Sequence, residues 1–506
     1  MSPLQRWLSG DLSKPVIHID GATVTRGELL QASENAAQYL YHLGFRQGDV
    51  LAILVPDSPV WLQFLFAASR LGVLLVPIST RYRSAEIEHV LKQSRASGIV
   101  VVRHFLKSDF LSVIQEIVPG LPQLRHVIPV DDANYFVAQD HKLDVALPEP
   151  DPASLLCTFN TSGTTGKPKL AAHTQASIVK HAEAVTVEYQ IATDTITLCP
   201  LPLYGVLGFV SAMATIAGGG RCVLQPVFKA EVSAQLIGAF KVTHIFGPDS
   251  LLDAVLRAPD ADLRSLKRVG FPEFAGLGLK LARFAEETFG IRLNAVYGMS
   301  ECFGLMAQRD IRGETERRVL PGGKPTTSDN MFRIADPLTG DVVGDGIPGE
   351  LQLKGPNVMA GYLNDPSATA AVTTSDGWFR TGDLACSDGK EFTFLSRMKD
   401  SLRLRGYLVD PTEIETFLTT HDNVKGAQVV GVNRLGRGDV AVAFVIPHRA
   451  QESSEADLIG FCSEGIANYK VPSRIVFLEQ FPEIAGPNGV KIQKTKLREM
   501  AETLVT

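Results

Sequence analysis

A run of small hydroxyl residues, glycines and lysines in the first third of the chain is suited to holding phosphate groups. The run is TSGTTGKPK, residues Thr161–Lys169. Its glycines allow the backbone to approach a ligand closely, and its amides, hydroxyls and ammonium groups can donate hydrogen bonds to phosphate oxygens. The spacing differs from the Walker pattern, because Gly163 and Gly166 are only three positions apart and Pro168 follows the lysine. Considered alone, the run also fits a polar loop without a ligand.

A second motif combines an aromatic ring, a hydroxyl and a carboxylate directly after an apolar, strand-like segment. It is YGMSE, in which Tyr297 offers a flat face to a purine and Ser300 offers a donor to a phosphate. Glu301 supplies the hard oxygen ligand that Mg²⁺ prefers, and strand ends are where ligands gather in α/β proteins. The ordinary alternative for Glu301 is a solvated or capping residue.

Three more polar positions suit the sugar and the reacting phosphate of a nucleotide. Asp383, which ends the motif GWFRTGD, can accept two hydrogen bonds and therefore fits a ribose diol. Arg397 begins the basic segment RMKDSLRLRGY, and Lys491 lies in NGVKIQKTKLR near the C-terminus. Considered singly, each also fits an ordinary role as an Asx turn, a surface strand or a solvated helix start.

The elements that must position these side chains alternate between strand-like and helical patterns. Strands alternating with helices predict βαβ units and a mostly parallel sheet. After about Gly323, short strands separated by Gly, Pro and Asp predict a small β-rich unit, and a compact α+β tail follows. We therefore expect an α/β fold, with a large domain over residues 1–398 and a small domain over 399–506. The predicted helices are 25–43, 59–71, 84–93, 177–188, 230–240 and 279–289, and the predicted strands are 49–55, 73–78, 98–102, 221–224, 243–246 and 292–296.

The composition describes a folded chain of enzyme size. The 506 residues include 55 acidic and 49 basic ones, which gives a net charge of −6, and 45% are apolar. These values exclude a disordered chain, and the lack of a long Lys/Arg run argues against a nucleic-acid partner. The six cysteines form no C-x-x-C pair, which argues against a zinc site and indicates a reducing, cytoplasmic location.

One uncharged stretch, TITLCPLPLYGVLGFVSAMATIAGGG at 195–220, has the length of a membrane span. Pro200, Pro202 and three closing glycines interrupt it. We therefore expect a buried strand, loop and helix that line an apolar pocket, and no transmembrane segment. The first fifteen residues carry charges and no apolar core, which argues against a secretory signal.

In this order and at these distances, the motifs resemble those of the adenylate-forming superfamily. That group includes acyl-CoA synthetases, 4-coumarate–CoA ligases, firefly luciferase and the adenylation domains of peptide synthetases. The resemblance runs from about Thr25 to Arg498 and includes Gly349–Pro366, Asp410–Glu415 and Asn468–Pro482. It implies two half-reactions: a carboxylate attacks the α-phosphate of ATP to form an acyl-adenylate and pyrophosphate, and a nucleophile, usually a thiol, then displaces AMP.

The resemblance implies a role for each motif. Lys491 matches the adenylation lysine, whose charge would stabilise the α-phosphate and orient the acid. Lys399 matches the hinge about which the small domain swings between half-reactions, and Gly406 would let a thiol arm pass. Glu301 would hold Mg²⁺, Tyr297 with 294–296 would flank the adenine, and Asp383, helped by Arg397, would bind the ribose. The expected ATP and AMP ligands are Thr161, Ser162, Gly163, Thr164, Thr165, Gly166, Lys167, Asn294, Ala295, Tyr297, Gly298, Ser300, Asp383 and Arg397.

Three departures from the family pattern concern the acid and the acceptor. Gly205 stands where many acyl-CoA synthetases have histidine, Phe271 and Glu273 stand in a turn that is usually small, and Tyr407 replaces the second glycine of a common pair. The expected acyl pocket is mostly apolar, which suits a cyclic, aryl or medium-length acid, although these residues also fit an ordinary core. The pocket residues are Tyr204, Gly205, Val206, Phe209, Phe271 and Met299.

The leading interpretation is an acid–CoA ligase that uses ATP, Mg²⁺ and CoA. A second interpretation keeps the adenylation but transfers the acyl group to an amine, as coronafacate-type ligases do, and a third transfers it to a carrier protein. Motifs do not decide among these acceptors, nor do they give the acid or the oligomeric state. A non-catalytic protein on the same fold is disfavoured, because Glu301, Asp383, Arg397 and Lys491 occur together.

Overall fold

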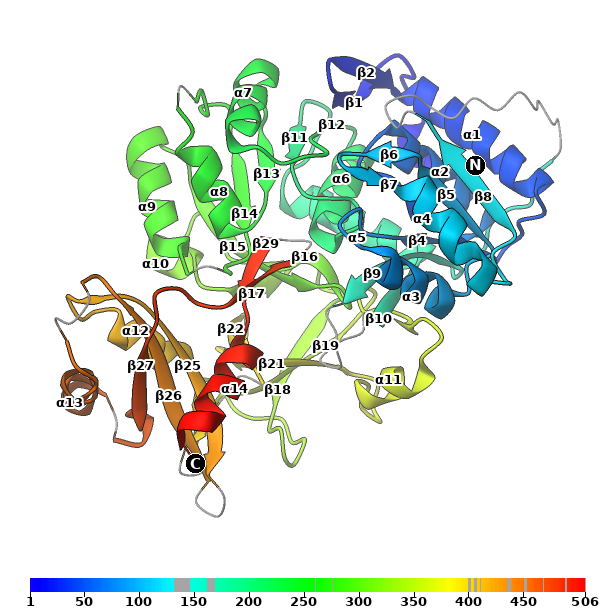
Figure 1. Ribbon diagram of the computed structural model, residues 1–506. Coiled ribbons are helices and arrows are strands. Elements are labelled where there is room, and N and C mark those ends of the chain that lie inside the picture. The colour runs from blue at the N-terminus through cyan, green and yellow to red at the C-terminus, as the bar shows by residue number, and fades with distance from the viewer. Residues whose placement is uncertain are drawn as a thin grey trace. The chain divides into compact units, whose positions relative to one another are not determined.

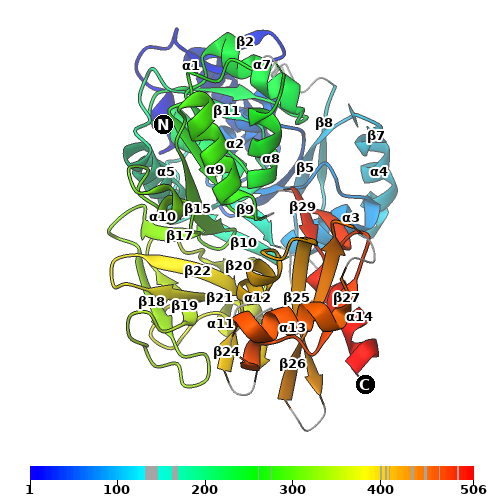
Figure 2. The ribbon, with the colours of Figure 1, turned by 90° about the vertical axis from the view of Figure 1, so that its left-hand side faces the viewer.

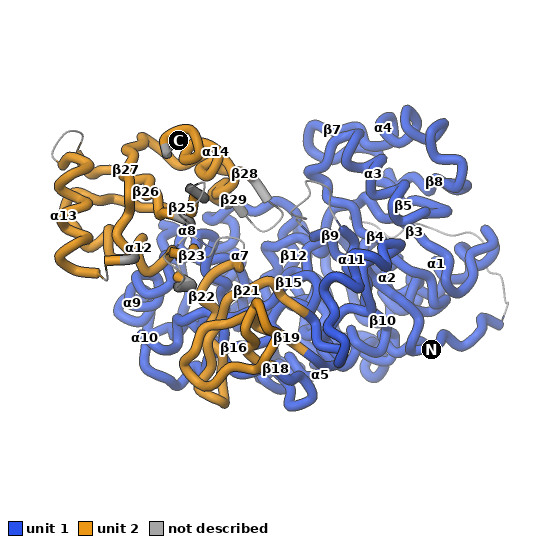
Figure 3. The backbone as a smooth tube through the Cα atoms, turned by 90° about the horizontal axis from the view of Figure 1, so that it is seen from below, with its two compact units in different colours: residues 1–331, 354–379 blue, residues 332–353, 380–506 orange. Residues whose placement is uncertain are grey.

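The computed structural model describes residues 1–131, 146–161, 169–259, 261–274, 276–398, 402–404, 407–409, 411–434, 438–449, 453–466, 468–486 and 489–505. The chain forms two compact units (Figure 3). Unit 1 comprises Met1–Met331 and Lys354–Phe379, and unit 2 comprises Phe332–Leu353 and Arg380–Thr506. Unit 2 therefore contains residues that precede position 399, and the functional boundary between 398 and 399 stays a prediction.

The first sheet of unit 1 carries the strands on either side of the hydroxyl-rich motif. β3, β4, β5 and β8 run parallel to their neighbours, β9 joins β4 in parallel, and β10 returns antiparallel to β9. The prediction of an α/β fold is thereby confirmed. The sheet order is β20 (Gly361–Tyr362), β10 (Lys169–Thr174), β9 (Leu155–Thr161), β4 (Leu74–Pro77), β3 (Val50–Leu54), β5 (Gly98–Val102) and β8 (His126–Val130).

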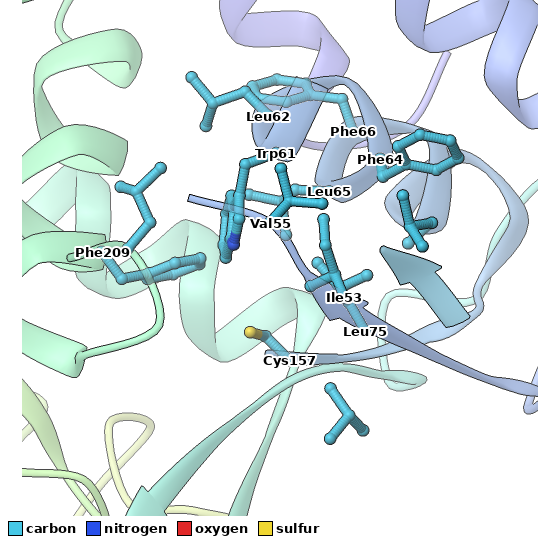
Figure 4. Packing of buried hydrophobic residues seen from close by; sticks show 14 of the residues in the cluster. Ile53, Val55, Trp61, Leu62, Phe64, Leu65, Phe66, Leu75, Cys157 and Phe209 are labelled. Carbon is cyan, nitrogen blue, oxygen red and sulfur yellow. The ribbon is translucent and has the colours of Figure 1, made fainter. Parts of the chain in front are cut away.

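Helix α2 (Pro59–Leu71) is the centre of the core beside this sheet, and all of its residues are buried. It begins where Ser58 accepts a hydrogen bond from the Trp61 amide, with proline at the first helical position, and it ends at Gly72 with a φ of 68°. A helix that is buried on every face must be covered by other elements on every face. Figure 4 shows Trp61 facing Phe209, and their rings meet edge to face at 6.2 Å.

The other elements around the first sheet are short or amphipathic. Helix α1 packs against α2 and has a capping box between Thr25 and Glu28. The bounds are η1 (Gln5–Leu8), α1 (Arg26–His42), α3 (Ser84–Ser94), β6 (His104–Phe105), β7 (Ser108–Asp109), α4 (Phe110–Ile117), η2 (Val118–Gly120), α5 (Gln175–Glu188) and α11 (Pro366–Ala371).

The second sheet of unit 1 is parallel in its middle and antiparallel at both ends. In order it contains β17 (Gly322–Pro325), β16 (Phe303–Gln308), β15 (Leu293–Met299), β14 (Arg268–Phe271), β13 (His244–Phe246), β11 (Ile196–Cys199), β12 (Arg221–Leu224), β1 (Pro15–Ile19) and β2 (Ala22–Thr25). Figures 1 and 2 show α7 (Ala230–Phe240), α8 (Asp249–Leu256) and α9 (Gly278–Phe289) side by side against this sheet. The short helix α10 (Thr315–Arg318) contacts α9.

The uncharged stretch at 195–220 folds as β11, a loop and helix α6 (Val206–Ala217). Every residue from Val206 to Ile216 is buried, so the predicted buried strand, loop and helix are confirmed. Within the described residues, no helix is long and apolar enough to cross a membrane. All six cysteines are free, and only Cys386 is more than slightly exposed.

Unit 2 contains the β-rich segment and the compact tail that the sequence predicts. One group of strands has the order β18 (Met331–Ala335), β19 (Gly349–Lys354), β21 (Phe379–Ser387) and β22 (Phe392–Arg397). The tail has a sheet ordered β24 (Tyr407–Val409), β23 (Leu402–Leu404), β26 (Gly438–Pro447) and β25 (Val424–Arg434), with β27 (Arg474–Phe477) also paired to β26. Its other elements are α12 (Pro411–Leu418), α13 (Glu455–Gly465), η3 (Asn468–Lys470), the hairpin of β28 (Glu483–Gly486) and β29 (Gly489–Ile492), and α14 (Lys494–Val505).

The hairpin of β15 and β16 closes so tightly that Gly298 cannot carry a side chain. A Cβ atom there would overlap the Phe303 carbonyl oxygen and lie 2.8 Å from the Gly304 Cα. We expect Gly298→Ala to lose about 3 kcal/mol of unfolding free energy, because the obstruction is backbone. Chemical denaturation of the purified variant measures this loss. Gly460→Ala is the control, since α13 leaves that position open, and it should gain about 0.5–1 kcal/mol; equal effects at the two positions would contradict the assignment.

Candidate functional site

Unit 1 brings the YGMSE turn against the end of the hairpin that carries the hydroxyl-rich motif. Thr161 pairs with Lys169 across β9 and β10, so these two residues are the base of the motif's loop. The Ser300 hydroxyl donates to the Asn160 carbonyl at 3.3 Å. The two motifs are therefore neighbours. The predicted phosphate ligands Ser162, Gly163, Thr164, Thr165, Gly166 and Lys167 lie outside the described residues.

Glu301 is a buried carboxylate with specific partners. Its side chain is 6% exposed, and Oε1 accepts a hydrogen bond from the Tyr362 hydroxyl at 2.8 Å. The Met359 amide donates to its carbonyl at 2.8 Å. Lys169 Nζ lies 4.9 Å from the centre of the Tyr362 ring, so the carboxylate, the ring and the base of the loop are connected. The sequence analysis did not single out Tyr362, although it lies in a quoted family segment.

The donor set around Glu301 fits a cation that is mostly held by phosphate and water. Among the described residues, no group of three His, Cys, Asp or Glu side chains could enclose a metal ion. Mg²⁺ commonly takes only one or two protein carboxylates and completes its shell with waters and substrate phosphates. A single carboxylate near the base of the hydroxyl-rich loop is compatible with that requirement.

The predicted adenine-flanking residues on β15 are not equally available to a ligand. Asn294 is 1% exposed, and its side-chain Nδ2 donates to Gln308 Oε1 at 3.0 Å and to the Arg309 carbonyl at 3.2 Å. Ala295 and Val296 belong to the apolar core. The chain emerges at Gly298, which is exposed, and the Tyr297 hydroxyl points to the Met299 sulfur at 3.9 Å. A ligand would therefore meet the strand at its end rather than along its length.

Four of the six predicted acyl-pocket residues, Tyr204, Gly205, Val206 and Phe209, lie at the N-terminus of α6, whereas Met299 ends β15. Gly205 is the N-cap of α6, and Tyr204 and Val206 are 6% and 7% exposed. Phe209 is deeper, packed edge to face on Phe159 at 5.1 Å. Phe271 is fully buried in a separate cluster under α9. Their role as pocket walls stays a prediction.

Glu273, the acidic residue in the turn after β14, has a structural role. Glu273 Oε1 accepts the Gly278 amide at 2.9 Å, at the start of α9. Asp249, which is fully buried, accepts the amides of Phe274 at 3.2 Å and Leu277 at 3.0 Å. Burial raises the pKa of Glu273, and the Gly278 amide opposes that shift. The two carboxylates shape this turn and accept two amides at the start of α9, those of Leu277 and Gly278.

Asp57 holds the loop that leads into α6, and the sequence analysis did not single it out. Its side chain is 4% exposed, and Oδ1 accepts the Leu203 amide at 2.8 Å. Burial raises the pKa of Asp57 to about 7, and the single amide donor only partly offsets this. Its place in the sequence VPDSP, between a strand and a helix cap, is the signal that would have identified it.

In unit 2, Asp383 and Arg397 face each other across β21 and β22. Their Cα atoms are register partners, and Arg397 Nη1 lies 2.9 Å from Asp383 Oδ1. Asp383 is 2% exposed, and its amide donates to the Thr381 hydroxyl at 3.0 Å. The structure therefore brings together the two residues that the sequence analysis assigned to the ribose.

The Lys491 segment belongs to a hairpin that is tied to the small core of the tail. Lys491 pairs with Ile484 across β28 and β29, and nothing is described of its side chain. Lys494 Nζ lies 2.8 Å from Glu415 Oε1, and the same carboxyl oxygen accepts the Val429 amide at 2.8 Å. This ion pair joins the start of α14, which follows the hairpin, to α12. Lys399 and Gly406 lie outside the described residues.

Comparison with known proteins decides the family. The family model for the AMP-binding enzyme matches residues 4–363, and the model for the AMP-binding enzyme C-terminal domain matches residues 413–485. The chain belongs to the AMP-binding enzyme family. It is an ATP-dependent, AMP-forming ligase of the adenylate-forming superfamily, as the motifs predict.

Similarity to curated members of the AMP-binding enzyme family extends over nearly the whole chain. 4-Coumarate-CoA ligase 1 from Narcissus pseudonarcissus is 29% identical, with 95% of this chain and 90% of the relative covered. Feruloyl-CoA synthase from an Amycolatopsis species is 30% identical, with 91% of each covered. Both names describe ligases that make CoA thioesters.

Solved structures show the same fold. ATP-bound MatB from Rhodopseudomonas palustris has a TM-score of 0.85 at 22% identity, with 100% of both chains covered. The amide bond synthetase McbA from Marinactinospora thermotolerans has a TM-score of 0.84 at 22% identity, with 98% of this chain and 99% of McbA covered. At these identities the likeness establishes the fold alone.

Asp57 predicts a pH-dependent contribution to stability. The unfolded chain loses the Asp57 proton near pH 3.8, whereas the folded protein keeps it until about pH 7. Between these values the folded state binds more protons, so this group's contribution falls as pH rises. Asp57→Asn cannot ionise and still offers an oxygen to Leu203. The variant should therefore be more stable than the wild type in this range. The difference in unfolding free energy should grow with pH and reach at most about 4 kcal/mol above pH 7.

Thermal unfolding of the wild type and Asp57→Asn between pH 4 and pH 8 measures this difference. Asp57→Ala is the matched variant, because it removes both the charge and the acceptor for the Leu203 amide. Its stability relative to Asp57→Asn should be lower at every pH. A difference between wild type and Asp57→Asn that does not change with pH would contradict the assignment.

Proposed function

We propose that this protein activates an apolar carboxylic acid as its acyl-adenylate and transfers the acyl group to CoA. The observation that carries the proposal is the buried Glu301, which is held by Tyr362 beside the base of the hydroxyl-rich loop. This arrangement suits ATP bound through its phosphates. The whole-length similarity to CoA ligases supports the choice of CoA as acceptor.

In the proposed mechanism, residues of unit 1 bind the phosphates and the base. The loop between Thr161 and Lys169 would donate hydrogen bonds to the phosphates, and Glu301 would hold Mg²⁺. Bound Mg²⁺ would neutralise phosphate charge. Tyr297 offers its ring to the adenine and Gly298 leaves room at the strand end, because an exposed glycine does not obstruct a flat ligand.

Residues of unit 2 complete the proposed chemistry. Asp383 accepts hydrogen bonds from the ribose hydroxyls while the ion pair with Arg397 holds the Asp383 carboxylate in place. Lys491 stabilises negative charge that develops on the α-phosphate and orients the attacking carboxylate. For transfer, the small domain would turn about Lys399, and Gly406 would give the thiol a narrow path. These roles rest on the family resemblance of each residue.

The proposed acid is cyclic, aryl or of medium length. The residues at the N-terminus of α6 are apolar and nearly buried, and Gly205 offers no polar side chain to the acid. An apolar pocket with few polar groups favours a hydrophobic ligand. A cytoplasmic location also remains our proposal, on the basis of the free cysteines.

An amine is the second candidate acceptor. The fold of this chain is shared with an amide bond synthetase, so the architecture itself permits either product. In both cases the first half-reaction is identical, and only the nucleophile that attacks the acyl-adenylate differs.

Lys491→Ala should lower ATP–pyrophosphate exchange by about 10²–10³-fold, because a preorganised charge at the α-phosphate is lost. The same variant, given a chemically prepared acyl-adenylate and CoA, should still form the thioester. Lys496→Ala is the matched control, since Lys496 is an exposed lysine five positions further along the same segment and should leave the exchange unchanged. Near-normal exchange by Lys491→Ala would refute the role of this lysine.

The acceptor is tested by offering the enzyme ATP, Mg²⁺ and a panel of acids. Hydroxylamine first traps any acyl-adenylate as a hydroxamate, which identifies the acid. Hydroxylamine is then replaced by CoA or by mixed amino acids, and the products are identified by mass. We expect a CoA thioester; an amide formed without CoA would overturn this choice and support the second candidate.

A further inference from the structure

The turn that carries Glu301 has an unusual backbone. Phe303 and Leu305 have φ angles of 66° and 58°, in the left-handed region that only glycine adopts easily. Both are bulky apolar residues in strand β16, and such conformations persist only where the surroundings hold them. Interactions that hold this segment therefore determine where Glu301, two residues before Phe303, can lie.

Two buried histidines hold the main chain on either side of Glu301. His173 Nε2 lies 2.8 Å from the Ser300 carbonyl, and His181 Nε2 lies 2.7 Å from the Gly304 carbonyl. A carbonyl can only accept, so both facing nitrogens carry hydrogen. His173 and His181 are 0% and 1% exposed, so both donors lie inside the protein, and the hydrogen bond to the Gly304 carbonyl is buried.

The same two imidazoles enclose the ring of Phe303. The His173 ring centre lies 3.9 Å from the Phe303 ring centre, and the His181 ring is nearly parallel to it at 5.0 Å and 7°. Asn357 in turn contacts His181 Nδ1. The two histidines come from β10 and α5, so the turn is attached to both elements that follow the hydroxyl-rich loop.

We propose that His173 and His181 are positioning residues that fix the Ser300–Leu305 turn and so place the Glu301 carboxylate for the cation that accompanies ATP. The inference rests on the proposed role of Glu301. Without the two N–H donors, the Ser300 and Gly304 carbonyls would lose these hydrogen bonds, and the strained segment would relax. The Glu301 carboxyl group would then remain in the turn but lose its fixed direction.

The test replaces each imidazole by a ring that cannot donate. His173→Phe and His181→Phe keep the ring contact with Phe303 and remove the hydrogen bond. The matched control is His244→Phe, because His244 is also buried and contacts the Tyr189 carbonyl at 3.0 Å, away from this turn. All three variants should unfold at lower temperatures, so thermal stability alone does not distinguish the roles.

The first readout is hydrogen exchange of the 300–306 peptide in protein without nucleotide. It should accelerate by at least about tenfold in the His173 and His181 variants and stay unchanged in His244→Phe. The second readout is the Mg²⁺ concentration for half-maximal ATP–pyrophosphate exchange. It should rise about 10–100-fold in the same two variants only, as when partners of a metal ligand are lost.

The outcomes separate the two proposals. If Glu301→Gln leaves the Mg²⁺ requirement unchanged, the role of Glu301 is wrong, and hydrogen exchange still shows whether the histidines hold the turn. The positioning role is refuted if both histidine variants show the same hydrogen exchange of the 300–306 peptide and the same Mg²⁺ requirement as His244→Phe. His173→Gln, which restores an N–H donor, should recover both properties in part, and it replaces His173→Phe if that variant does not fold.

Discussion

The arrangement of unit 1 depends on keeping one carboxyl group, that of Glu301, in a nearly closed environment with specific partners. Burying a charged group is costly unless hydrogen bonds replace the water it loses. Glu301 receives such a bond from Tyr362, and the Met359 amide holds its main chain. These contacts require segment 357–362 to lie beside Glu301, and the Ser300–Asn160 hydrogen bond brings the strand pair β9–β10 to the same turn. The same contacts bring the carboxylate to the base of the hydroxyl-rich loop.

The long elements could be predicted from the sequence because their signals are local. Helix α2 begins and ends at the predicted residues, since Ser58, Pro59 and Gly72 mark both ends, and β5 and β12 also match. The β1–β2 hairpin and α8 were not predicted. Each is short, and β1 is held by β12, which lies about 200 residues away in the chain. Contacts at that separation leave no periodic pattern in the sequence.

The candidate site was predictable in its motifs but not in its supporting contacts. Asp383 and Arg397 were assigned to one function, and the strand register brings them together. No motif marks Tyr362, His173 or His181, and Asp57 has only the short local pattern VPDSP. Their positions follow from the tertiary fold, which places them beside Leu203, Glu301, Ser300 and Gly304. Glu273 shows the reverse case, in which an unexpected acid has an ordinary task at a helix end.

The distribution of cysteines has a practical consequence for measuring motion in this enzyme. Five of the six thiols are buried, and burial raises the pKa of Cys462 to about 11. Thiol reagents attack the thiolate and need access to it. Cys386 on β21 is thus the natural attachment point for a maleimide fluorophore. The unmodified enzyme would carry one dye in unit 2, and a second dye introduced in unit 1 would allow energy transfer to follow the catalytic cycle.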